Sequence, residues 1–134
     1  MNNKELIDEA VKARTNSHSP YSQFAVGAAL LTKSGRVFTG CNVENISYRL
    51  TMCAEQGAVS AAIAQGERDF ISIAVVADSN RPIVPCGACR QVLAEFNPAM
   101  EVIMATVNGA EETVRLDELL PRPAQGILES TKDV

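Results

Sequence analysis

The chain has 134 residues, a length that suits one hydrophobic core and is short for two ordinary domains, so we expect a single domain over residues 1–134. It is 46% apolar and 21% charged, an ordinary composition for a globular protein that argues against disorder and coiled coil. Its net charge of −4 and its lack of a basic tract favour a small, neutral or weakly charged substrate over nucleic acid.

The first elements are a helix and a hairpin. Apolar residues at helical spacing predict a helix over residues 4–15, and Ser19–Ser22 reads as a break after it. Two apolar stretches, residues 25–32 and 36–43, flank a Lys-Ser-Gly turn and predict a β-hairpin.

The rest of the chain alternates between helices and strands. Two central helices are predicted over residues 53–65 and 86–96, the first closed by Gly66 and the second preceded by Pro85. Strands are expected at residues 70–76, 102–107 and 112–116, with a last helical turn over residues 117–120. This order predicts an α/β fold of three layers, α-β-α, around a mixed central sheet.

The start of the chain and its cysteines bear on location and chemistry. The opening MNNKELIDEA is charged and has no apolar segment typical of a secretory signal. No run approaches the ~20 apolar residues of a membrane-spanning helix. We therefore expect a cytoplasmic protein without membrane association, whose four cysteines are reduced and serve metal binding or catalysis.

Three of the cysteines are placed to bind a metal. Cys86 and Cys89 form a C-x-x-C at a predicted helix start, where positions i and i+3 share a face. Helix N-termini favour the thiolate, which is the ligand form. Cys53 begins the other central helix. If the two helix starts converge, three thiolates leave a fourth tetrahedral position for water, which is the arrangement of catalytic zinc.

Glu55 follows Cys53 by two residues. A carboxylate beside such a centre can take a proton from water and return it to the substrate. Taken alone, an acid in a first helical turn is better explained as an interaction with the helix dipole. Between Cys53 and the Pro85-Cys86 sequence, the catalytic interpretation is the stronger one.

These two motifs are similar to the signature of zinc nucleobase deaminases, in its variant with three cysteine ligands. CAE at Cys53–Glu55 and PCGACRQ at Pro85–Gln91 resemble the small cytidine deaminases with three cysteine ligands. PYSQFAVGAALLTKSGRVFTGCNVEN, residues 20–45, is similar to that family's N-terminal hairpin, and ELLP at Glu118–Pro121 to its C-terminal segment. The resemblance covers nearly the whole chain and implies a cytidine deaminase-like fold.

The resemblance also implies roles for single residues. It places one Zn²⁺ per chain on Cys53, Cys86 and Cys89, with Glu55 moving the proton. Asn42 and Glu44 would hydrogen-bond the ribose, and two residues apart on a strand they share a face. The resemblance places Phe24 in the wall of the base pocket. It implies a homotetramer whose active sites lie at subunit interfaces. The implied reaction is hydrolysis of cytidine or deoxycytidine to uridine or deoxyuridine with release of ammonia, a step of pyrimidine salvage.

The chain departs from the family pattern at two places. Gln56, beside the zinc ligands, stands where the family normally has arginine, so a neutral side chain replaces a cation. The family's LLPGAF near the C-terminus reads LLPRPAQG here, without the phenylalanine that the family gives to a neighbouring subunit's pocket.

Other interpretations remain open at this stage. A deaminase of modified cytosine nucleosides, similar to the blasticidin S deaminases, also lacks arginine after CAE, although Asn42 and Glu44 favour ordinary ribose. A deaminase of bases within RNA or DNA is opposed by the acidic balance. A non-catalytic zinc module with Cys41 as a fourth ligand would have no use for Glu55. We expect Cys41 in the core of the hairpin and His18 in a solvated loop.

Overall fold

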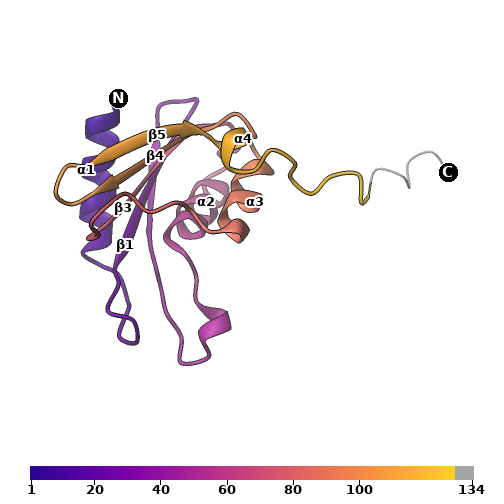
Figure 1. The fold of residues 1–134 in the computed structure, drawn as a ribbon. Helices are drawn as coiled ribbons and strands as arrows, with labels where there is room; N and C mark the ends of the chain where they lie inside the picture. Colours follow the sequence, from indigo (N-terminus) through magenta and orange to yellow (C-terminus); the bar gives the residue numbers. More distant parts are fainter. Residues whose placement is uncertain (129–134) are drawn as a thin grey trace.

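In a computed structural model, which describes residues 1–128, one five-stranded sheet organises the chain (Figure 1). The strand order is β2-β1-β3-β4-β5. Only β3 and β4 pair in parallel, and the other neighbours are antiparallel, so the sheet is mixed as predicted. The strands are β1 (Val26–Thr32), β2 (Val37–Cys41), β3 (Phe70–Ala77), β4 (Glu101–Thr106) and β5 (Glu111–Arg115).

Helices cover both faces of this sheet. On one face, α1 (Asn3–Arg14) packs across β1 and β3; on the other, α2 (Ala54–Ala64) lies on β2 and β1 with α3 (Gly87–Ala94) beside it (Figure 1). The short α4 (Leu116–Leu119) follows β5 and contacts α3. The three-layer α-β-α prediction is therefore confirmed.

Alternation along the strands divides the core into two parts. On β1, Ala29 faces α1 with Leu6 and Ala10, whereas Ala28 and Leu30 face α2. On β3 the same alternation separates Ala74 and Val76 from Ile73 and Val75. Since every residue of β3 except Ile71 is buried, its continuous apolar run reflects helices on both faces.

Two glycines allow the helices to lie close to the sheet. A Cβ on Gly27 would stand 2.0 Å from the Ala10 carbonyl oxygen of α1, and a Cβ on Gly40 would stand 2.3 Å from the Ala54 carbonyl oxygen of α2. Only glycine permits such approaches. Gly40 in this way sets how closely the first turn of α2, which follows Cys53, approaches β2.

The chain leaves the sheet earlier than the sequence predicts. β2 ends at Cys41, two residues before the predicted end, because the Asn42 carbonyl accepts from His18 N–H and the segment then turns toward the residue 17–24 loop. A 3₁₀ turn, η1 (Tyr48–Leu50), is a further element that the sequence did not indicate.

Candidate metal centre and active site

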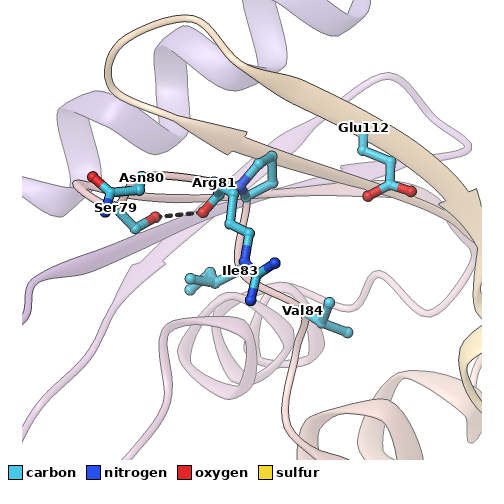
Figure 2. A pocket seen from close by; sticks show the side chains of 7 residues that line it. Ser79, Asn80, Arg81, Ile83, Val84 and Glu112 are labelled. Carbon is cyan, nitrogen blue, oxygen red and sulfur yellow. Dashed lines mark hydrogen bonds between the residues drawn. The ribbon is translucent and has the colours of Figure 1, made fainter.

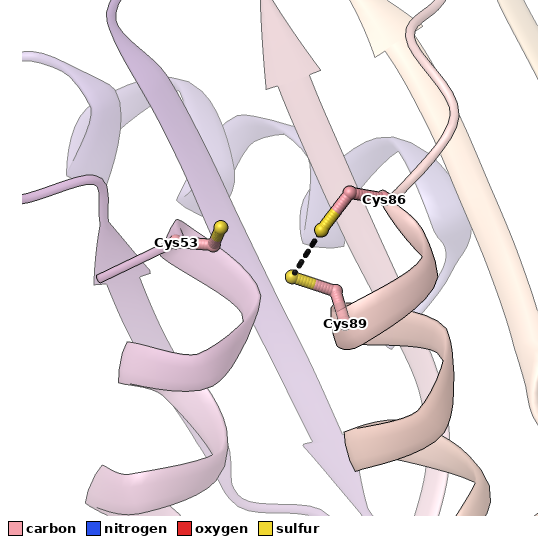
Figure 3. A group of neighbouring side chains, drawn as sticks. All are labelled: Cys53, Cys86 and Cys89. Carbon is pink, nitrogen blue, oxygen red and sulfur yellow. Dashed lines mark hydrogen bonds between the residues drawn. The ribbon is translucent and has the colours of Figure 1, made fainter. Parts of the chain in front are cut away.

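Two helix starts present cysteines to one point. Cys53 is the N-cap of α2 and Cys86 the N-cap of α3, both with extended backbone, and Cys89 lies in the first turn of α3 (Figure 3). Neither cap residue makes the side-chain hydrogen bond of an ordinary N-cap. Their sulfur atoms are therefore left for another partner, beside helix ends that favour negative charge.

The spacing of the three thiols fits zinc. All three Sγ atoms lie within 4.8 Å of one another, and the Sγ atoms of Cys86 and Cys89 are 3.5 Å apart. Zn–S bonds of about 2.3 Å at tetrahedral angles require sulfur–sulfur distances of about 3.8 Å. Cys41 is not part of this group. Three soft ligands leave one coordination position open.

Protons within the thiol group are unevenly held. A hydrogen bond with Cys89 lowers the pKa of Cys53 to about 7, while that hydrogen bond and burial raise the pKa of Cys89. Of these two thiols, Cys53 is the one that ionises first. Metal binding requires thiolates, so the group releases protons when it is loaded.

Glu55 lies directly behind the cysteines, in the first turn of α2. Its side chain is buried, at 5% exposed, and burial raises the pKa of its carboxyl group. A carboxyl group with a raised pKa holds a proton closer to neutral pH, as proton transfer to and from a substrate requires. Among the described residues it is the acid that shares a cavity with the three thiols.

That cavity is small and partly apolar. It measures about 170 Å³. Its walls come from the start of β1, the segment after β2, the segment before α2, the loop before α3, and the first turns of both helices: Val26, Asn42, Thr51, Cys53, Ala54, Glu55, Ile83, Cys86 and Cys89. A larger opening of about 650 Å³, between residues 79–84 and Glu112 of β5, contains Arg81 but none of the cysteines (Figure 2). The smaller cavity is therefore the candidate active site.

Asn42 lines this cavity, whereas Glu44 is not among the lining residues; both side chains are buried, and both hold the loop of residues 17–26. Asn42 Nδ2 donates to the Phe24 carbonyl at 2.8 Å, and Oδ1 accepts from Val26 N–H at 2.9 Å and from the Ser17 hydroxyl. The Glu44 carboxylate accepts from Tyr21 N–H, at 3.0 Å, and from both the N–H and the hydroxyl of Ser22.

The hydrogen bond from the Ser22 hydroxyl, aided by the two backbone N–H groups, keeps the pKa of Glu44 below its usual range. Glu44 is therefore ionised at neutral pH. Its carboxylate has about four acceptor positions, of which three are occupied, and Asn42 keeps one free N–H. The pair can still bind a sugar hydroxyl.

Phe24 lies outside the cavity wall. Its side chain is 39% exposed, and its backbone is tied to Ser22 and Asn42. Val26, two residues later, lines the cavity in its place. The role of Phe24 at the base therefore stays a prediction.

The comparisons with known proteins agree with this site. The family model of the cytidine and deoxycytidylate deaminase zinc-binding region matches residues 1–106. The chain belongs to this family. The resemblance seen in the motifs is thereby confirmed. Cys53, Cys86 and Cys89 bind zinc in this chain, as expected for a member of this zinc-binding deaminase family.

Individual relatives extend the match. A cytidine deaminase of Halalkalibacterium halodurans is 51% identical over 122 residues, covering 90% of this chain and 92% of the relative. The crystal structure of a cytidine deaminase from Burkholderia pseudomallei superposes with a TM-score of 0.90 at 46% identity, covering 92% of this chain and all of that one. A blasticidin-S deaminase of Bacillus cereus is 30% identical over 125 residues, covering 87% of this chain and 88% of the relative.

Gln56 partly replaces the arginine of the deaminase pattern. Its Nε2 lies 3.6 Å from Cys89 Sγ, so it donates one hydrogen bond to the thiol group but brings no charge. The guanidinium N–H groups of Arg90 that donate hydrogen bonds are engaged away from the sulfurs, at the carbonyls of Pro85, at 2.7 Å, and Leu119, at 3.0 Å. The formal charges of three thiolates and Zn²⁺ sum to about −1, and the neutral Gln56 does not offset this negative charge.

Replacing Gln56 by arginine is expected to raise kcat/KM and to shift the acidic limb of its pH profile to lower pH. A cation beside the thiolates makes loss of a proton from the anionic centre easier, and charge-assisted hydrogen bonds are about twice as strong as neutral ones. Steady-state rates across a pH series on zinc-loaded protein measure both effects. Gln65→Arg, which adds the same charge at the far end of α2, is the control. An unchanged limb and rate in Gln56→Arg would mean that helix N–H groups already offset the charge.

Four cavity residues were missed by the sequence reasoning: Val26, Thr51, Ala54 and Ile83. Val26 and Ile83 are ordinary apolar residues, and nothing in their sequence positions separates them from core residues. Thr51 precedes the zinc ligand Cys53 by two residues, and in an extended segment that spacing places both side chains on the same side, so its position could have predicted a place in the cavity.

Proposed function

We propose that this chain is a zinc-dependent hydrolase that deaminates cytidine and deoxycytidine to uridine and deoxyuridine with release of ammonia, in pyrimidine salvage. The observation that carries the proposal is the buried Glu55 carboxylate in one small cavity with three zinc-ligating thiols. A closed structural zinc site has no use for such a carboxylate. Two relatives named cytidine deaminase, 51% and 48% identical to this chain, support the substrate class.

The reaction replaces the C4–N4 bond of the base by a C4–O bond. Zinc held by Cys53, Cys86 and Cys89 supplies a Lewis acid that lowers the pKa of water. Glu55 would accept one proton from the attacking water and pass it to N3 of the base; it would then take the remaining proton from the new C4 hydroxyl and give it to the amino group, which leaves as ammonia while C4=O forms. Burial suits Glu55 to this cycle, because it raises the pKa of the carboxyl group and so makes its protonated form easier to reach than that of an exposed glutamate.

Asn42 and Glu44 position the sugar in this proposal, and Phe24 lies against the base. Support comes from two buried polar side chains, Asn42 in the cavity wall and Glu44 two residues after it, each with one hydrogen-bonding position to spare. The hydrogen bonds from both residues to the loop of residues 17–26 also tie the position of Phe24 to the sugar-binding pair.

A modified cytosine nucleoside is the second candidate substrate. It is favoured by Gln56, because the blasticidin S deaminases also lack arginine after CAE. It is opposed by the lower identity, 30% to the Bacillus cereus blasticidin-S deaminase against 51% to the Halalkalibacterium halodurans cytidine deaminase.

A substrate panel with ammonia detection tests the function. We expect zinc-loaded protein to release ammonia from cytidine and deoxycytidine, and not from adenosine or a cytosine-containing oligonucleotide. Blasticidin S is the discriminating arm, because a preference for it over cytidine would establish the second candidate. Protein that carries zinc but releases ammonia from none of these compounds would show that the proposed activity is wrong.

The active protein is proposed to be a cytoplasmic homotetramer with active sites at its subunit interfaces. Support comes from residues 43–52, beside the site, where Ile46, Tyr48 and Leu50 are 84%, 60% and 69% exposed. Clustered exposed apolar residues of this kind mark interaction surfaces. Native mass spectrometry of zinc-loaded protein tests the tetramer. No helix within residues 1–128 has the length and apolar character needed to cross a membrane.

A further inference from the structure

The hydroxyl of Thr51 is buried without a hydrogen-bond partner among the described residues. Thr51 Oγ1 is the one buried side-chain polar atom in that part of the chain for which this is so, and Thr51 is one of the residues that line the candidate active site. An unsatisfied buried hydroxyl destabilises a fold, so each such group calls for an explanation. A ligand that enters the cavity would supply the missing partner.

The backbone places Thr51 on the same face as the proposed sugar-binding residues. Val43 and Met52 exchange two N–H···O hydrogen bonds of 2.9 Å in an isolated antiparallel bridge. In that register Thr51 lies across from Glu44, and Cys53 lies across from Asn42.

Exposure along the two segments shows which side each residue faces. Val43 and Met52 point outward, at 46% and 44% exposed, whereas Asn42 and Glu44 are buried. Because side chains alternate along extended segments, Thr51 and Cys53 point to the same side as Asn42 and Glu44. Thr51 therefore lies beside Glu44 and on the same side as the zinc ligand Cys53.

Asn42 and Glu44 are left with little capacity for a sugar. Both acceptor positions of Asn42 Oδ1 are taken by Val26 N–H and the Ser17 hydroxyl, which leaves one N–H. Glu44 has about one acceptor position left. A sugar has several hydroxyls, each of which donates and accepts. The Thr51 hydroxyl can rotate to do either, so it adds what the other two side chains lack.

We infer that Thr51 is a further substrate-binding residue, whose hydroxyl hydrogen-bonds a hydroxyl group of the nucleoside's sugar. This inference rests on the proposed function and deepens it, because it makes Thr51 a determinant of which sugars are accepted. It also gives the unsatisfied hydroxyl a role, since the substrate would supply the hydrogen-bond partner that Thr51 Oγ1 lacks in the described residues.

The test compares Thr51→Val, which keeps the shape and removes the hydroxyl, with Thr51→Ser, which keeps the hydroxyl. The substrates are cytidine, its 2′-, 3′- and 5′-deoxy forms, and free cytosine. For cytidine we expect Thr51→Val to raise KM roughly 3–10-fold with little change in kcat, the effect of losing one neutral hydrogen bond. Thr51→Ser should stay near the wild-type values. For one of the three deoxynucleosides, Thr51→Val and wild type should have the same KM. The hydroxyl missing from that nucleoside is the one that Thr51 contacts.

Two readouts separate substrate binding from a structural role. Zinc content should be equal in all variants, and Thr51→Val should melt no lower than wild type, because it removes an unsatisfied buried hydroxyl. An unchanged KM for cytidine in Thr51→Val would overturn the inference. So would an equal rise for all three deoxynucleosides and cytosine, or a loss of zinc. Wild-type protein that releases no ammonia from cytidine would instead refute the proposed function.

Discussion

Replacing Glu55 by glutamine is expected to lower kcat/KM for cytidine by about 10²-fold or more, the contribution of a positioned general acid and base. The amide has almost the same shape, but it can neither accept the proton of the attacking water nor pass it to N3 of the base. Rates on zinc-loaded protein, with zinc measured per chain, provide the result. The three thiols are untouched by the change, so the zinc content should be that of wild type.

Stability distinguishes this loss from unfolding. Burial raises the folded-state pKa of Glu55 above its unfolded value, so in metal-free protein its ionisation costs stability as pH rises above the ordinary range of a glutamate. Glutamine avoids that cost, so metal-free Glu55→Gln should melt no lower than metal-free wild type at neutral pH. The exposed Glu95→Gln, at the end of α3, should leave the rate unchanged. Near-normal turnover in zinc-loaded Glu55→Gln would favour a structural zinc site.

The main elements of the fold could be predicted because their signals are local. The apolar run of β3 and the helical spacing of α1 each lie within a dozen residues, and the order of elements then favours a mixed sheet between helices. The end of β2 is different. It depends on hydrogen bonds between Asn42 and the loop of residues 17–26, far away in the sequence, so the predicted strand ran two residues too long.

The residues of the site also fall into those with a local sequence signal and those placed only by tertiary contacts. Cys53 and Glu55 are two residues apart, and Cys86 and Cys89 are three apart. Each pair lies at a helix start, so the helical backbone alone fixes how its two side chains are placed. No such spacing ties Thr51 or Ile83 to the cavity, because they reach it through an antiparallel bridge and through the loop before α3. The double role of Asn42, facing the cavity while holding the loop, is likewise a tertiary property.

Removing one zinc ligand is the second change for which we expect a large effect. Cys89→Ala should reduce bound zinc from about one per chain to well below that, and cytidine deamination should fall with it. Cys89 is the buried member of the thiol group, and its sulfur contacts both Cys86 Sγ and Gln56 Nε2. With two thiolates left, the ion loses a third of its protein ligands. Its binding free energy is in part folding free energy, so the melting temperature should drop as well.

Cys41→Ser is the matched control, because it removes a thiol at the end of β2, close to α2 but outside the zinc-binding group. This variant should keep its zinc and its activity. The comparison decides between an open and a closed centre, since a closed structural site needs a fourth protein ligand and Cys41 is the remaining cysteine. Equal loss of zinc from Cys41→Ser and Cys89→Ala would mean that no coordination position is left for the reacting water. Zinc retained in Cys41→Ser alone would leave that position open, beside the carboxylate of Glu55 that the proposed deamination requires.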